Sequence, residues 1–181
     1  MYLNDELLSN YDLVIPDTVT SIGSYLFVDC TFLRSVYIPH SVKTLGKSIF
    51  YGCVGEELTI NCDMFTPDVE YIGDPAFAYS RFAKIIIGQE VRSIEKYELS
   101  NNGGFSQEIV IQCDEVNING AAFEGCTGHL TIDGNINAVR SEFYNLKLSK
   151  LTIGPNVSSI SLHGTSFSSS ISELHISDIA T

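Results

Sequence analysis

Basic side chains are scarce in this sequence. Its 181 residues contain 10 lysines and arginines against 22 aspartates and glutamates, so the formal net charge is −12. A surface of that sign repels phosphate backbones, and we therefore expect no nucleic-acid partner. Such a charge also keeps a protein soluble, which is the simpler explanation of it.

Long apolar runs are missing as well. No stretch approaches the roughly 20 apolar residues that a helix needs to cross a bilayer, so we expect no membrane span in this chain. Residues 1–6 (MYLNDE) have neither the basic start nor the apolar run of a secretion signal. If the protein is exported, its leader is not present in this sequence.

The motifs of common catalytic and metal sites are absent too. The sequence has no Cys-x-x-Cys pair, no glycine-rich phosphate loop and no Ser-His-Asp spacing. An enzyme acting on carbohydrate would need carboxylates clustered on one sheet face. The candidates Glu57, Glu108 and Glu173 instead alternate with lysine or histidine. We predict no enzymatic activity, no cofactor and no metal, and we rank carbohydrate binding below protein binding.

A repeat is what the sequence does contain. The segment Leu13-Val14-Ile15-Pro16 recurs 23 residues later as Val36-Tyr37-Ile38-Pro39. The residues that follow recur at the same offset, up to Cys30 and Cys53. A fixed period of 20–29 residues with apolar-x-apolar cores is typical of a solenoid. We therefore predict a cap segment at residues 1–10 and a single elongated domain over residues 11–181.

Eight strands are predicted from two columns of large aliphatic residues. The first column is Leu13, Val36, Leu58, Ile85, Ile109, Leu130, Leu151 and Leu174. The second, two residues later in each copy, is Ile15, Ile38, Ile60, Ile87, Ile111, Ile132, Ile153 and Ile176. Residues two apart in a strand share a face, so both columns are expected to point into the coil.

The back of each repeat has its own pattern. A Val-x-x-Ile pair, such as Val19 and Ile22, predicts a short second strand. A phenylalanine follows five residues later, and we expect it to fill the coil from a short helical turn. These aromatic plugs are Phe27, Phe50, Phe77 and Phe123, with Leu99 in the equivalent place of one repeat. The predicted fold is therefore mainly β, a solenoid with a parallel concave sheet.

The cysteines number five, so they cannot all pair within one chain. Cys30, Cys53 and Cys126 each lie eight residues after a repeat aliphatic residue, which places them in one inward column. Free cysteine packs well as a small buried residue, and we expect packed thiols rather than disulfides.

The repeat L-x-x-V-x-I-P-x-x-V-x-x-I-G-x-x-x-F-x-x-C resembles the BspA-like leucine-rich repeats, and residues 33–53 carry the best copy. The resemblance implies a right-handed leucine-rich-repeat solenoid. It also implies a bacterial surface or secreted protein that adheres to a protein partner, such as host extracellular matrix or another surface protein. An intracellular or structural scaffold remains the alternative. No cap is evident after the last predicted strand, which is typical of a fragment or of a swapped or shared end.

A partner is expected to bind the outward residues of the predicted strands. Tyr37, Ile86 and Val110 are expected to be exposed apolar anchors, although β-branched residues also occupy such positions for propensity alone. Alternating charges at Glu57, Lys84 and Glu108 are expected to pair across strands. The predicted ligand-binding residues are Tyr37, Thr59, Lys84, Ile86, Val110, Thr131 and Thr152.

Overall fold

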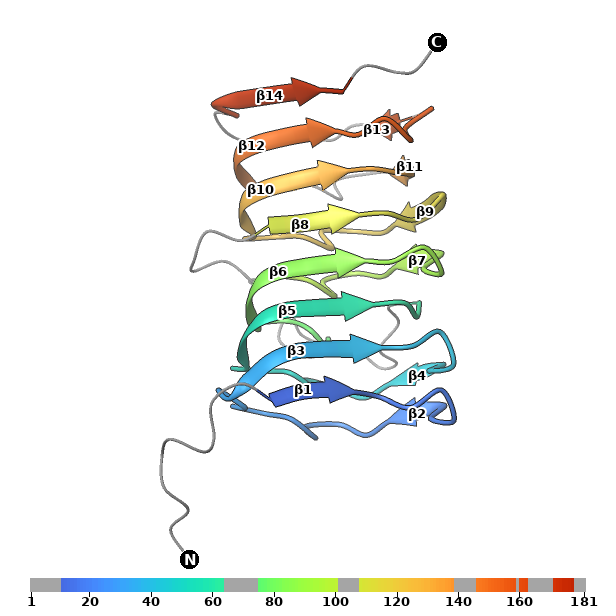
Figure 1. The fold of residues 1–181 in the computed structure, drawn as a ribbon, viewed down its shortest axis with the longest axis vertical. Coiled ribbons are helices and arrows are strands. Elements are labelled where there is room, and N and C mark those ends of the chain that lie inside the picture. Colours follow the sequence, from blue (N-terminus) through green and yellow to red (C-terminus); the bar gives the residue numbers. More distant parts are fainter. Residues whose placement is uncertain are drawn as a thin grey trace, which may run out of the picture.

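Eight parallel strands form one large sheet. The computed structural model describes residues 11–63, 75–100, 108–138, 146–158, 160–162 and 171–177. The strands, in their order across the sheet, are β1 (Tyr11–Val14), β3 (Leu33–Ile38), β5 (Val54–Ile60), β6 (Arg81–Ile87), β8 (Glu108–Ile111), β10 (Thr127–Ile132), β12 (Lys147–Ile153) and β14 (Glu173–Ile176). They are stacked one above another from β1 to β14 (Figure 1). This arrangement confirms the mainly β solenoid, while the predicted cap at residues 1–10 lies outside the described residues.

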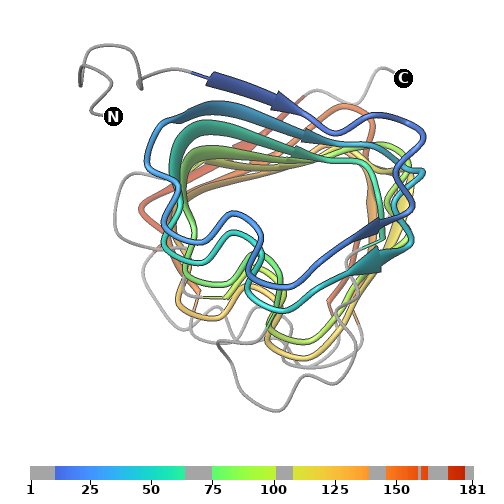
Figure 2. The same cartoon turned by 90° about the horizontal axis from the view of Figure 1, so that it is seen from below.

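Short strands line a second side of the coil. They are β2 (Ser21–Ile22), β4 (Thr44–Leu45), β7 (Ser93–Ile94), β9 (Glu115–Ile118), β11 (Asn135–Ala138) and β13 (Ile160–Leu162). Strands β2 and β4 pair with each other, and the other four pair in the order β13-β11-β9-β7. Figure 2, a view along the stack, shows the large sheet and the short strands as two sides of each turn of the coil, which we call a rung.

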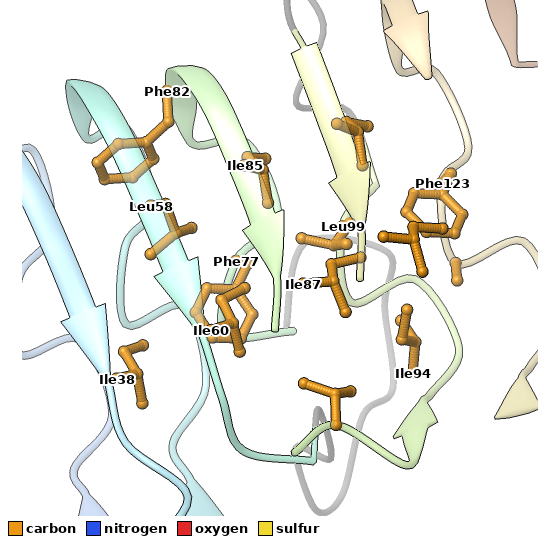
Figure 3. Close-up of a cluster of buried hydrophobic side chains, with 14 of the residues drawn as sticks. Ile38, Leu58, Ile60, Phe77, Phe82, Ile85, Ile87, Ile94, Leu99 and Phe123 are labelled. Atoms are coloured by element: carbon orange, nitrogen blue, oxygen red, sulfur yellow. The ribbon is translucent and has the colours of Figure 1, made fainter. Parts of the chain in front are cut away.

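The aliphatic columns form the core between these sides, as predicted. Leu58 and Ile60 on β5, like Ile85 and Ile87 on β6, are completely buried, and Figure 3 shows them among other buried side chains of the core. The last strand differs, because β14 is an edge strand with a described neighbour on one side only. Its inward residues Leu174 and Ile176 are 59% and 66% exposed.

Stacked phenylalanines fill the coil at its first rungs. The ring of Phe50 stacks on Phe27 and Phe77, with centroid distances of 5.3 and 5.8 Å. The sequence did not indicate a fourth member, Phe82, which lies near the start of β6. Its ring is edge-on to that of Phe50, with 6.3 Å between the ring centroids. The plug residues Phe50, Phe77, Leu99 and Phe123 are completely buried.

The predicted helical turns around the plugs are wrong, since the described residues contain no helix. At Phe27, Phe50 and Phe123 the residues two before and two after the plug have left-handed backbone angles, which interrupt any helical run. Around Phe27 they are Tyr25 (φ 60°) and Asp29 (φ 56°), and around Phe50 they are Ser48 (φ 49°) and Gly52 (φ 72°). Backbone hydrogen bonds also run between rungs at these turns, as from Phe27 N–H to the Ile49 carbonyl oxygen at 3.0 Å.

The five cysteines are free thiols, and four of them are buried while Cys30 is partly buried. The Cys53 thiol donates a hydrogen bond to the carbonyl oxygen of Phe27 at 2.7 Å. The Cys126 thiol likewise donates a hydrogen bond to the carbonyl oxygen of Leu99, at 2.9 Å. The predicted packing of thiols into the coil is confirmed, and each of these two bonds ties its rung to the preceding one.

Candidate functional site

The outward residues of the large sheet stand in register, as predicted. One row, in pairing order, is Val14, Tyr37, Thr59, Ile86, Val110, Thr131, Thr152 and His175. The neighbouring row is Asp12, Ser35, Glu57, Lys84, Glu108, His129, Lys150 and Glu173. We call the surface that these two rows form the outward face. With strands spaced about 4.8 Å apart, it extends over roughly 34 Å.

Three of the predicted binding residues, Tyr37, Thr59 and Ile86, meet in a hollow of about 420 Å³ on this face. Six further residues line it: His40, Asn61, Gly88, Gln89, Glu90 and Gln112. Each of these six lies one to three residues beyond the end of β3, β5, β6 or β8, where a strand passes into its turn. The hollow therefore combines an apolar and aromatic patch of the sheet with a polar rim at the carboxyl ends of its strands.

The shape of the hollow depends on three residues from neighbouring rungs. Asn61 donates a hydrogen bond from Nδ2 to the Tyr37 hydroxyl oxygen at 3.2 Å, which orients the tyrosine. The Asn61 amide oxygen lies directly over Gly88, and a Cβ at that glycine would overlap it. Only glycine at position 88 leaves the room in which the asparagine side chain reaches Tyr37.

Charges of both signs lie around the hollow. Glu90 has no hydrogen bond or ion pair with any described residue, so its exposed carboxylate is available to a ligand. Two cations are placed at the same rim, because Lys43 Nζ donates to the His40 carbonyl oxygen and Arg92 Nη1 to that of Gln89, both at 2.7 Å. Both cations are thus held on the backbone of rim residues.

Lys84 pairs with Glu57 on the adjacent strand, as predicted, with 4.0 Å between Nζ and Oε2. Both side chains are well exposed, and such surface pairs contribute about 0–1 kcal/mol to stability. The pair therefore neutralises the face beside the hollow more than it stabilises the fold.

The expected exposure of Val110 is wrong. This side chain is 8% exposed, although it stands in the outward row. Its neighbours in register are Ile86 on one side and Thr131 on the other, and these branched side chains flank it. Val110 therefore offers a partner little contact area.

Thr131 and Thr152 belong, with His129, to a separate group farther along the face, which we call the His129 cluster. His129 Nε2 lies 2.9 Å from the Thr152 hydroxyl oxygen and 3.2 Å from that of Thr131. Beyond it, His175 and Lys150 lie 2.7 and 3.9 Å from the two oxygens of Glu173, and the hydrogen bond from His175 is the main cause that lowers the pKa of that carboxyl. Of the seven predicted residues, three line the hollow, two belong to this cluster, and Lys84 and Val110 belong to neither.

No group of three or more His, Cys, Asp or Glu side chains among the described residues is arranged to hold a metal ion. None of the described segments forms a helix long and apolar enough to cross a membrane.

Comparison with known families agrees with this architecture. The profile of the BspA type leucine-rich repeat region matches residues 5–129 and 106–180, in six copies. The chain belongs to the BspA-type leucine-rich repeat family. No curated protein and no solved structure gives a significant match. Leucine-rich repeats generally mediate protein–protein interactions, and their solenoids are typically non-enzymatic binding scaffolds. Members of the BspA-type family are often surface or secreted proteins.

Proposed function

We propose that this protein is a non-enzymatic adhesion module that holds a protein partner on its outward face and acts at the cell surface or after secretion. The observation that carries the proposal is the hollow formed by Tyr37, Thr59 and Ile86. Interfaces concentrate their binding energy in a few anchors seated in pockets, and aromatic side chains are common among them. Tyr37 is 37% exposed at such a position.

The outward face supports the proposal in two further ways. Its strands belong to a stacked sheet with a buried core, so the hollow is built on rigid elements rather than on a single loop. The face is long enough for an extended segment of a partner, which would contact the hollow first and the His129 cluster farther along.

A double substitution tests the binding face. Tyr37→Ala with Ile86→Ser should abolish capture of the protein by an immobilised panel of extracellular-matrix and cell-surface proteins, because both anchors of the hollow are removed. The matched control is Tyr25→Ala, which removes a tyrosine that is 61% exposed and lies outside the outward face. Unchanged capture by the double variant would refute the binding face.

A second measurement tests the location. Antibody labelling of intact cells should detect the protein, and added protease should remove the signal. Labelling that appears only after lysis would refute the surface role and support an intracellular scaffold.

A further inference from the structure

The rim of the hollow offers hydrogen-bond donors and acceptors side by side. Asn61, Gln89 and Gln112 each carry an amide, which has both an acceptor oxygen and a donor NH₂ group. The Tyr37 hydroxyl can donate and accept, the Thr59 oxygen can accept because its hydrogen is donated to Glu57 at 3.4 Å, and Glu90 contributes acceptors. A cation would need acceptors alone and an anion donors alone. The mixture suits a ligand whose own groups both donate and accept, and adjacent hydroxyl groups are of that kind.

The charges favour a neutral ligand. The Glu90 carboxylate shares the rim with two cations, since Lys43 and Arg92 donate to the carbonyl oxygens of the rim residues His40 and Gln89. On the sheet, Glu57 and Lys84 offset each other. The overall charge of −12 is therefore not concentrated at the hollow, and neither sign of ligand gains a clear advantage there.

The size and shape of the hollow narrow the class of ligand further. The volume of about 420 Å³ lies within the roughly 300–1,000 Å³ of small-molecule sites. The partly exposed ring of Tyr37 and the side chain of Ile86 give the hollow an apolar patch beside its polar rim. A sugar ring has the matching pair of surfaces, because its C–H groups form apolar patches and its hydroxyls surround them.

We propose that the hollow binds one neutral pyranose residue of a glycan that the protein partner carries. This inference rests on the proposed function, since it names the chemistry of the partner at the same site. The sequence had ranked carbohydrate binding below protein binding, because Glu57, Glu108 and Glu173 on the strands do not form the cluster of carboxylates that a catalytic site needs. The polar rim lies beyond the ends of the strands. It contains one carboxylate, that of Glu90, and binding of a sugar, unlike catalysis, needs no cluster of carboxylates.

The first test is a titration with small probes. Methyl glycosides of glucose, galactose, mannose and N-acetylglucosamine are added to ¹⁵N-labelled protein, and the side-chain amide signals of Asn61, Gln89 and Gln112 are followed. At least one glycoside should shift them with a dissociation constant on the order of 1 mM. Gln112→Ala and Tyr37→Ala should each weaken that binding about tenfold or more, whereas Tyr25→Ala should leave it unchanged. No shift with any glycoside, or shifts confined to other residues, would overturn the inference.

The second test separates the glycan from the protein that carries it. A synthetic peptide bearing a neutral N-linked glycan and the same peptide without the glycan are compared as ligands. Binding of the glycosylated form alone supports the inference, and equal binding of both forms overturns it while leaving protein binding intact. The proposed function fails separately, if the Tyr37→Ala and Ile86→Ser double variant still captures protein partners.

Discussion

Asn61 and Tyr37 are joined by a hydrogen bond of 3.2 Å that links the turn after β5 to the outward face of β3. The tyrosine oxygen accepts the asparagine N–H, so the hydroxyl hydrogen of Tyr37 remains available to a ligand. A residue of the sheet and a residue of a neighbouring turn thus line the same hollow. The geometry depends on Gly88, over which the Asn61 amide lies.

Gly88→Ala should therefore close the hollow without unfolding the protein. The new methyl group would overlap the Asn61 amide oxygen and displace that side chain from Tyr37. The lost hydrogen bond costs about 1 kcal/mol, which is partly offset because alanine reduces the freedom of the unfolded chain by about 0.4–1 kcal/mol. Partner capture should fall about tenfold or more, and the melting temperature should change by only a few degrees.

The matched control for this variant is Gly120→Ala. A Cβ at Gly120 would meet its nearest neighbour, Lys96 Cγ, at an ordinary 3.5 Å. This variant should bind and melt like the parent. Normal capture by Gly88→Ala would show that the position of the Asn61 side chain does not matter for binding.

Gly52→Ala should destabilise the turn behind the plug Phe50. Gly52 has a φ of 72°, a conformation that costs an L-residue about 1–2 kcal/mol, and its new Cβ would also overlap the Asp29 carboxylate. We expect a loss of about 1–2 kcal/mol in urea denaturation. The control Gly23→Ala meets no atom within 4 Å and has no positive φ, so equal destabilisation of both variants would contradict the explanation.

Phe50→Ala should weaken the first rungs selectively. Phe50 is completely buried and contacts Phe27, Phe77 and Phe82, and truncating such a residue costs about 3–5 kcal/mol. Since each rung of a solenoid contacts mainly its neighbours, the damage should stay local. Amide hydrogen exchange should increase in β3 and β5 and change little in β10 and β12. Uniform acceleration along the chain would show that the coil unfolds as one unit.

The strands could be predicted because their signal is both local and repeated. Alternation of inward and outward residues places Ile38 and Tyr37 on opposite faces, and the same phase in eight copies fixes the register of the sheet. The outward rows therefore matched the predicted positions. Burial within those rows could not be read in the same way, because the exposure of Val110 depends on its branched neighbours Ile86 and Thr131.

The turns were harder to predict for a different reason. Tyr25, Ser48 and Ala121 adopt left-handed angles that their residue types do not indicate, so the turns around the plugs were mistaken for helical ones. The rim of the hollow was missed because its residues lie beyond the strands, where the copies differ. The role of Gly88 depends on Asn61 in the preceding rung, a contact that no local pattern reveals.

The buried thiols should make the protein less stable at high pH. Burial raises the pKa of Cys53 and Cys62 to about 12 and that of Cys113 to about 11, from an ordinary value of 9.0. Between pH 9 and these values the unfolded chain loses thiol protons that the folded chain retains. The stability that neutral thiols provide is complete below pH 9 and is lost as the pH rises through this window.

Replacing Cys62 by alanine should reduce the slope of unfolding free energy against pH, measured by urea denaturation from pH 8 to 11. Val91→Ala, which also removes buried core volume but no thiol, should lower stability while keeping the parent slope. Equal slopes in the parent and in Cys62→Ala would show that this thiol does not contribute to alkaline unfolding.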